Sequence, residues 1–266
     1  MTQDLGQRGL APRPALRQLR WEIIIVLALS LGQSAIYSIL SIVNKLTRPE
    51  PLKQQVTRMN TSATPDRPWL DLAYQVANMA FPLVPVALAI FLLAIHQRPA
   101  EGPWRVMGFD LRRPKFDLAW GFGTFAVIGV AGLAFYLFAV AIGINTQVAP
   151  ANLAANWWTI PVLIGRAIMN GVLEEVLMVG YLFTRWAQLG GRLWVVVVVS
   201  AFIRGGYHLY QGFGGFIGNL VMGLAFGWLY LKIKRVMPLV IVHSLLDIVA
   251  FLGAPLLPVL MAWIGR

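Results

Sequence analysis

The chain has 266 residues, of which 58% are hydrophobic and 12% are charged, and it contains no cysteine. An average soluble domain has about 25% charged residues, so this composition excludes an ordinary water-soluble protein. The absence of cysteine excludes disulfide bonds and thiolate metal sites. The net charge of +11 comes from Lys and Arg in short loops between apolar segments. That distribution sets membrane topology and does not indicate binding to nucleic acid.

Long apolar runs predict an all-α, polytopic transmembrane helical bundle. The runs reach the roughly 20 residues that cross a hydrocarbon core as a helix, and they lack the short alternation of a membrane β-barrel. We expect about eight spans, seven of full length and a short or re-entrant eighth at residues 254–264. The seven lie at residues 21–44, 69–95, 117–144, 157–185, 193–210, 212–231 and 236–252.

Basic residues before the first span, after the second and after the sixth predict which side of the membrane is cytoplasmic. These residues are Arg8, Arg13, Arg17, Arg20, Arg98, Arg105, Arg112, Arg113, Lys115, Lys232, Lys234 and Arg235. The positive-inside rule places them in the cytoplasm, although four basic residues on the first outer loop oppose this assignment. We therefore expect an integral protein of a bacterial plasma membrane with a cytoplasmic N-terminus.

Two adjacent carboxylates, Glu174 and Glu175, lie inside the apolar run of the fourth span. A carboxylate at the centre of a membrane helix costs about 2.5–3.5 kcal/mol, so the pair needs partners or a chemical role. Consecutive helical positions lie about 100° apart, which predicts that one Glu faces a site and the other a neighbouring helix. The alternative is a buried ion pair that only holds helices together.

Three further titratable residues follow on later spans. His243 and Asp247 are four residues apart and share a helical face, so the carboxylate can orient the imidazole or both can bind one ion. His208 follows Arg204 by one turn. Each of these residues alone also fits a hydrogen-bonded core position. Together with the Glu pair they predict a polar site inside the membrane.

The order of these groups resembles the CPBP family of intramembrane proteases. That family includes the type II CAAX prenyl endopeptidases and the bacteriocin-processing and abortive-infection-like proteins. Its first motif, Glu-Glu-x-x-x-Arg, is matched at Glu174-Glu175, with Val179 in place of the Arg. Its second, Phe-x-x-x-His, is matched by His208, with Arg204 in place of the Phe. His243 and Asp247 match the third, His-x-x-x-Asn/Asp.

The resemblance implies an intramembrane endopeptidase that hydrolyses a peptide bond of a membrane-associated or prenylated-type peptide in the lipid bilayer. Glu174 would activate water, and His208, His243 and Asp247 would position that water or stabilise the oxyanion. Glu175 would support the site or fix helix packing. No cofactor is expected, and if a metal is present we expect zinc on Glu174, His208 and His243.

The two departures from the family motifs suggest that one charge has moved. Arg204 would pair with Glu175 through two hydrogen bonds in place of the missing Arg. The alternative is that Arg204 lines a wet cavity or reaches the interface. Two other functions also fit, namely a proton-coupled transporter and an inactive membrane binding protein.

The predicted organisation has four parts, and no oligomeric state follows from the sequence. They are a cytoplasmic N-terminal tail (1–20), N-terminal transmembrane helices (21–145), a CPBP-like catalytic core (155–255) and a C-terminal short helix or tail (256–266).

Overall fold

The computed structural model describes residues 16–95, 102–149 and 151–264. For residues 254–264 only the helical backbone is described. Most of the predicted N-terminal tail, residues 1–15, lies outside the described residues, as do the last two residues of the chain.

The N-terminal half is helical, as predicted, and its helices are interrupted by irregular turns. In chain order the helical segments are α1 (Leu16–Leu27), the π-helical turn η1 (Ala28–Gly32), α2 (Gln33–Leu46), the 3₁₀ turn η2 (Leu52–Gln54), α3 (Pro68–Ala80), the 3₁₀ turn η3 (Phe81–Leu83), α4 (Val84–Ile95), α5 (Pro103–Met107) and α6 (Pro114–Ala141). The turn η3 contains Pro82, where the helix loses a backbone donor.

The C-terminal half contains the Glu pair and both predicted site histidines. Its helical segments are α7 (Thr159–Glu175), the π-helical turn η4 (Val176–Tyr181), α8 (Leu182–Gln188), α9 (Leu193–His208), the 3₁₀ turn η5 (Leu209–Gln211), α10 (Phe213–Ile233) and α11 (Met237–Ile264). Residues 254–264, assigned by sequence to a short eighth span or a re-entrant tail, continue α11.

Five helical stretches of the described chain are long and apolar enough to cross a membrane, which confirms the polytopic all-α class. They are Leu16–Leu46, Pro68–Ile95, Pro114–Ala141, Leu193–Gln211 and Phe213–Ile233. A shorter apolar helix covers Met237–Gly253. The segment at residues 159–188 is not among the five, and it contains Arg166, Glu174, Glu175 and Arg185.

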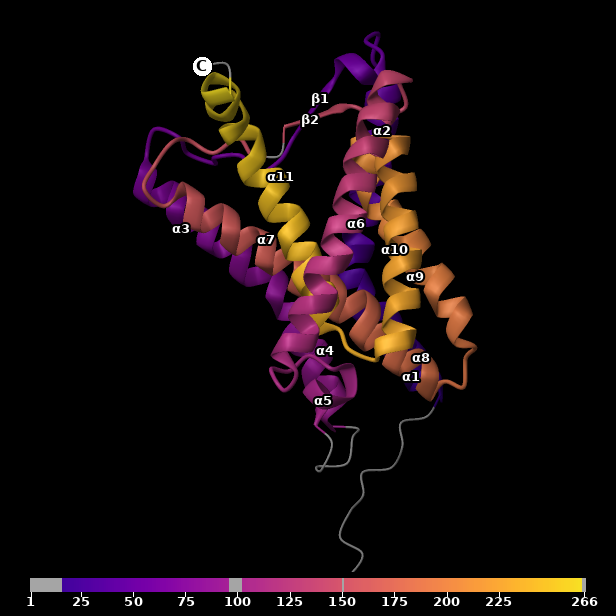
Figure 1. Cartoon of the computed structure of the whole chain (residues 1–266). Helices are drawn as coiled ribbons and strands as arrows, with labels where there is room; N and C mark the ends of the chain where they lie inside the picture. Colours follow the sequence, from indigo (N-terminus) through magenta and orange to yellow (C-terminus); the bar gives the residue numbers. More distant parts are fainter. Residues whose placement is uncertain (1–15, 96–101, 150, 265–266) are drawn as a thin grey trace, which may run out of the picture.

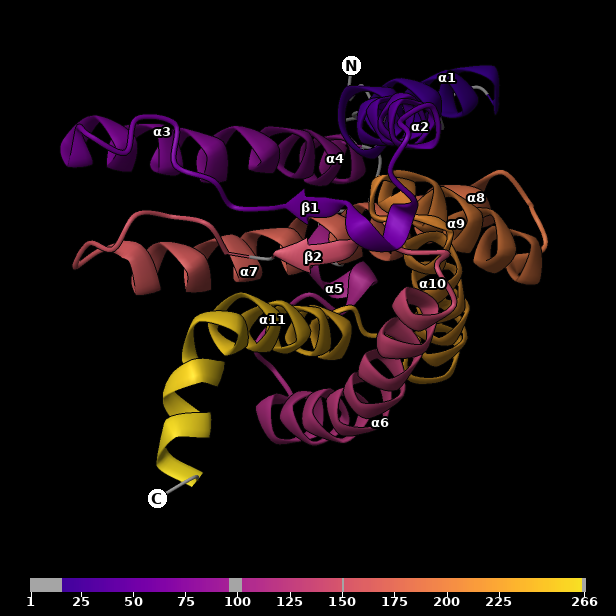
Figure 2. The same ribbon diagram turned by 90° about the horizontal axis from the view of Figure 1, so that it is seen from above.

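Two segments that were predicted to be loops form a small parallel sheet. Strand β1 (Val56–Arg58) pairs with β2 (Gln147–Ala149). Figure 2 shows the two strands crossing one end of the bundle between α2 and α11. Strands of three residues have too little side-chain alternation to be recognised in a sequence.

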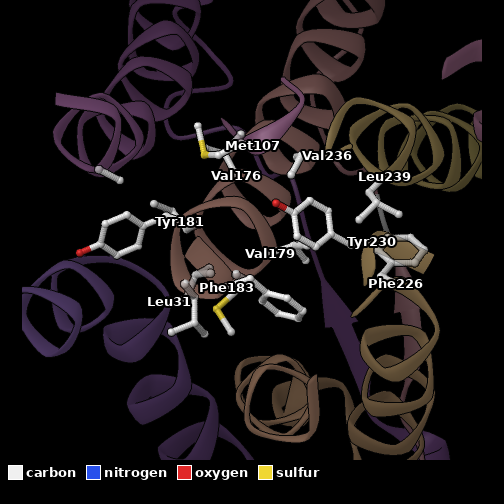
Figure 3. Packing of buried hydrophobic residues seen from close by; sticks show 14 of the residues in the cluster. Leu31, Met107, Val176, Val179, Tyr181, Phe183, Phe226, Tyr230, Val236 and Leu239 are labelled. Carbon is white, nitrogen blue, oxygen red and sulfur yellow. The ribbon is translucent and has the colours of Figure 1, made fainter. Parts of the chain in front are cut away.

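The helices diverge toward the strands and pack around an apolar core at the opposite end. In Figure 1, α3 and α7 lean away from α2 and α10 toward the end that holds β1 and β2. At the opposite end, near α5, apolar side chains pack around η4, as Figure 3 shows. Arg235 stabilises that end by donating to Asp117 at 2.6 Å and to Asp110 at 2.9 Å.

Candidate active site

The Glu pair occupies the last turn of α7, directly before the π-helical turn η4. Such turns are frequent at functional sites because they redirect side chains within a helix. Close packing of α7 on α11 brings the pair to His243. A Cβ atom added at Gly171 would lie 2.5 Å from Ser244 Oγ and 3.0 Å from the carbonyl oxygen of Val240, so only glycine permits this approach.

Glu175 is fully buried, and its partners are a guanidinium and an imidazole. Its Oε1 accepts a hydrogen bond from Arg204 Nη2 at 2.6 Å and another from His243 Nδ1 at 2.7 Å. Arg204 is itself fully buried, and its guanidinium lies 5.3 Å from the ring centroid of Phe226. This arrangement links α7, α9 and α11 through one carboxylate oxygen.

Glu174 has different neighbours. Its Oε2 accepts a hydrogen bond from the Tyr207 hydroxyl at 2.6 Å. The same oxygen lies 3.5 Å from Arg204 Nη1 and 3.9 Å from His243 Nε2. Among the described residues, none donates a hydrogen bond to Glu174 Oε1. The carboxylate is therefore fixed by one oxygen, and the other is left for a ligand.

His208 and Asp247 approach the same space from α9 and α11. The Nδ1 of His208 lies 3.1 Å from the carbonyl oxygen of Arg204, so Nδ1–H donates and Nε2 is turned away from the helix. The Oδ2 of Asp247 accepts a hydrogen bond from Asn170 Nδ2 at 2.8 Å, and its Oδ1 lies 4.0 Å from His243 Nε2.

A cavity of about 860 Å³ joins these groups. It is lined by Glu174, His208, His243 and Asp247, together with Tyr207 and Asn170, among others. Glu175 and Arg204 do not line it. The structure thus brings four of the predicted site residues to one cavity and buries the other two behind its wall.

Tyr207 and Asn170 were not identified from the sequence. Tyr207 directly precedes His208, and Asn170 lies one turn before Glu174. A polar residue one turn from a buried carboxylate on the same helix is a usable signal, because such positions share a face. The Tyr207–Glu174 contact joins two helices, and no spacing within one helix predicts it.

Residues 156–249 match the family model of the type II CAAX prenyl endopeptidase Rce1-like proteins. This part of the chain is similar to the Rce1-like proteins, and we call it the Rce1-like domain. No curated protein and no solved structure matches the chain.

The Rce1-like domain contains all six residues that the sequence analysis singled out, from Glu174 to Asp247. The match confirms the resemblance predicted for about residues 155–255. It supports an intramembrane endopeptidase of the CAAX type, embedded in a lipid bilayer and acting on a peptide substrate.

One group of side chains in the Rce1-like domain has the geometry of a possible metal site. Ligand atoms of Glu174, Glu175 and His243 all lie within 4.8 Å of one another. This set includes Glu175 where the sequence analysis expected His208. Glu175 Oε1 already accepts from the Arg204 guanidinium and from His243 Nδ1, so a cation bound there would displace hydrogen bonds and meet a positive charge. The Arg204 guanidinium therefore competes with a cation for Oε1 of Glu175.

Proposed function

We propose that this protein hydrolyses a peptide bond of a membrane-associated peptide with a water molecule activated by Glu174. The observation that carries this proposal is the division of the Glu pair. Glu174 lines the cavity with one oxygen that has no hydrogen-bond partner among the described residues. Glu175 does not line the cavity: its Oε1 accepts from Arg204 and His243, and its unpaired Oε2 is buried. A positioned carboxylate with a free oxygen is the arrangement that a general base requires.

The reaction begins when Glu174 Oε1 removes a proton from a water molecule in the cavity. The water oxygen forms a bond to the carbonyl carbon, and the carbonyl oxygen becomes an oxyanion. His208 and His243 hold the water and, when protonated, donate to that oxyanion. The C–N bond then breaks, and the proton on Glu174 passes to the leaving nitrogen. The products are an amine and a carboxylic acid, which then loses its proton to solvent.

Glu175, Arg204 and Asp247 have positioning roles in this mechanism. Arg204 neutralises Glu175, and Glu175 orients the His243 ring by accepting from Nδ1. Asp247, held by Asn170, lies on the cavity side of the same ring. We assign residues 155–255 to the catalytic core and residues 21–145 to helices that complete the cavity, with 1–20 and 256–266 as terminal extensions.

We propose that the reaction proceeds without a metal. The support is chemical, since the Arg204 guanidinium already supplies the positive charge that a metal would bring to the Glu pair. Metal analysis of active, purified protein tests this point. One zinc ion per chain, with activity lost on its removal, would contradict it.

Cleavage in proteoliposomes tests the proposed function against a proton-coupled transporter. The probe is an internally quenched decapeptide that carries one farnesylated cysteine, compared with the same peptide without the lipid. We expect a rise in fluorescence and two fragments by mass spectrometry. A pH-sensitive dye inside the vesicles should report no substrate-driven proton flux. Proton flux without fragments would instead support the transporter.

A further inference from the structure

One wall of the cavity comes from outside the Rce1-like domain. It is formed by α2, whose polar cavity-lining residues follow one another at helical spacing. These residues, the α2 stripe, are Gln33, Ser34, Tyr37, Ser38 and Ser41. Positions three and four apart lie on one helical face, so the α2 stripe runs along the helix as a continuous polar strip.

Packing of α2 against the bundle does not require the polar side chains of the α2 stripe. The rest of α2 shows an apolar surface suited to lipid, for example Ile36 at 63% and Leu40 at 58% exposed. Tyr37 is 65% exposed, and Gln33 and Ser34 are exposed as well. An exposed polar side chain on a membrane helix carries a free-energy cost unless it contacts water or a polar ligand.

Two members of the α2 stripe also have structural partners. Ser38 Oγ accepts a hydrogen bond from the backbone N–H of Tyr210 at 2.6 Å. Ser41 Oγ accepts from Lys45 Nζ at 3.3 Å. The Ser38 contact attaches α2 to η5, directly after α9, while the Ser41 contact lies within α2. Gln33, Ser34 and Tyr37 are the members left to meet a ligand.

The packing of the bundle favours an approach from the strand end. At the α5 end the cavity is closed by an apolar core in which Met107, Val179 and Tyr181 are at most 1% exposed. Toward the strands its lining includes Met59 and Asn60, which follow β1 directly. In Figure 1 this is also the end where α3 and α7 lean away from α2.

The dimensions of the α2 stripe fit a peptide in an extended conformation. From residue 33 to residue 41 the helix rises about 12 Å, at about 1.5 Å per residue. An extended chain covers that distance with about four residues, at about 3.3 Å per residue. Each turn of α2 offers a hydroxyl or amide about every 5.4 Å, close to the two-residue repeat of about 6.6 Å in an extended backbone.

We propose that the α2 stripe binds the backbone of an extended substrate segment and leads its scissile bond to Glu174. The inference rests on the proposed function and specifies how the substrate is held. The titratable side chains that line the cavity, among the described residues, are the carboxylates Glu174 and Asp247 and the imidazoles His208 and His243. They lie beside the scissile bond, while the α2 stripe contacts the backbone of the bound segment through uncharged polar groups.

Photo-crosslinking tests the contact directly. A benzophenone amino acid is placed at position 37 or, as a matched control of nearly equal exposure, at position 36. Both are made with Glu174→Gln, so that binding suffices and no turnover is needed. The probe is the farnesylated decapeptide in proteoliposomes. We expect crosslinks from position 37 at least tenfold above those from position 36. Equal crosslinking at the two positions, or none at position 37, overturns the proposal.

Steady-state kinetics provides a second readout that a purely structural role would not produce. Ser34→Ala combined with Tyr37→Ala is expected to raise KM about tenfold and to leave kcat within a factor of two, because the lost contacts bind substrate and transition state equally. Ile36→Ala should change neither constant. A lower kcat at unchanged KM contradicts binding by the stripe. If wild type cleaves neither peptide, the proposed function fails, while the crosslink still reports on the stripe.

Discussion

At the residue scale, two adjacent glutamates have separate environments because one helical step turns their side chains apart. Their angular separation predicted this division, and the structure shows Glu174 on the cavity and Glu175 behind it. The predicted pairing of Arg204 with Glu175 is also found, but through one hydrogen bond and not two. The reason is geometric, because the guanidinium is shared, with Nη2 on Glu175 and Nη1 3.5 Å from Glu174.

Replacing Arg204 should lower the stability of the protein, because both glutamates lose a nearby positive charge. Arg204→Ala leaves Glu175 buried without its charge partner, and we expect a loss of about 3–5 kcal/mol in the free energy of unfolding. Val179, which packs in the same core cluster as Phe226, occupies the usual position of the family's Arg. Val179→Arg with Arg204→Phe should recover much of that loss. Thermal unfolding in one detergent measures the stability of the single and the double variant. A double variant no more stable than Arg204→Ala would show that an Arg at position 179 cannot replace the one at position 204.

Tyr207 is expected to act on catalysis by fixing Glu174. Tyr207→Phe removes one hydrogen bond to a charged group, worth about 1.5–3 kcal/mol, and should lower kcat about 10- to 100-fold. KM should change little, because the ring remains in place, and the melting temperature should fall by several degrees with the lost hydrogen bond. Tyr230→Phe, which removes a hydroxyl from the apolar core away from the cavity, is the control. Equal effects of the two changes on kcat would show that Tyr207 has no specific role.

At the element scale, the contact between α7 and α11 places the Glu pair against His243. Gly171→Ala should separate the two helices, since the new methyl group would lie within 3.0 Å of Ser244 Oγ and of the Val240 carbonyl oxygen. We expect a destabilisation of about 1–3 kcal/mol and a fall in cleavage. Gly132→Ala on α6, where no atom lies within 4 Å of the new methyl group, should stabilise the protein by about 0.5–1 kcal/mol. Thermal unfolding of both variants checks the opposite signs.

The sequence predicted the elements that depend on local composition. Apolar runs placed the helices near residues 21–44, 69–95 and 117–144, because span length follows from bilayer thickness. The parallel pairing of β1 with β2 joins segments about ninety residues apart and has no local signal. The same limit applies to the site, since spacing grouped His243 with Asp247, whereas the Tyr207 contact and the α2 wall arise from packing between helices.

At the scale of the whole molecule, the cavity lies toward the β1–β2 end, so its access depends on which way the protein is inserted. We propose that the N-terminus is cytoplasmic, as the basic residues on the α5 side favour. The chain has no cysteine, so single cysteines report topology without background. In intact bacterial cells, a membrane-impermeant maleimide should label Lys53→Cys on the outer loop. It should label Arg112→Cys only after permeabilisation. The reverse pattern would place the N-terminus outside.

The most direct test of the account is the turnover of Glu174→Gln with the quenched, farnesylated peptide in proteoliposomes. Gln keeps the shape of the side chain but cannot take a proton from water. Loss of a general base lowers the rate about 10²- to 10⁴-fold, and we predict a fall in kcat of that size without a change in melting temperature. Glu50→Gln, at an exposed carboxylate in the loop between α2 and η2, should be fully active. Turnover of Glu174→Gln close to that of the wild type would contradict the assignment of Glu174 as the base.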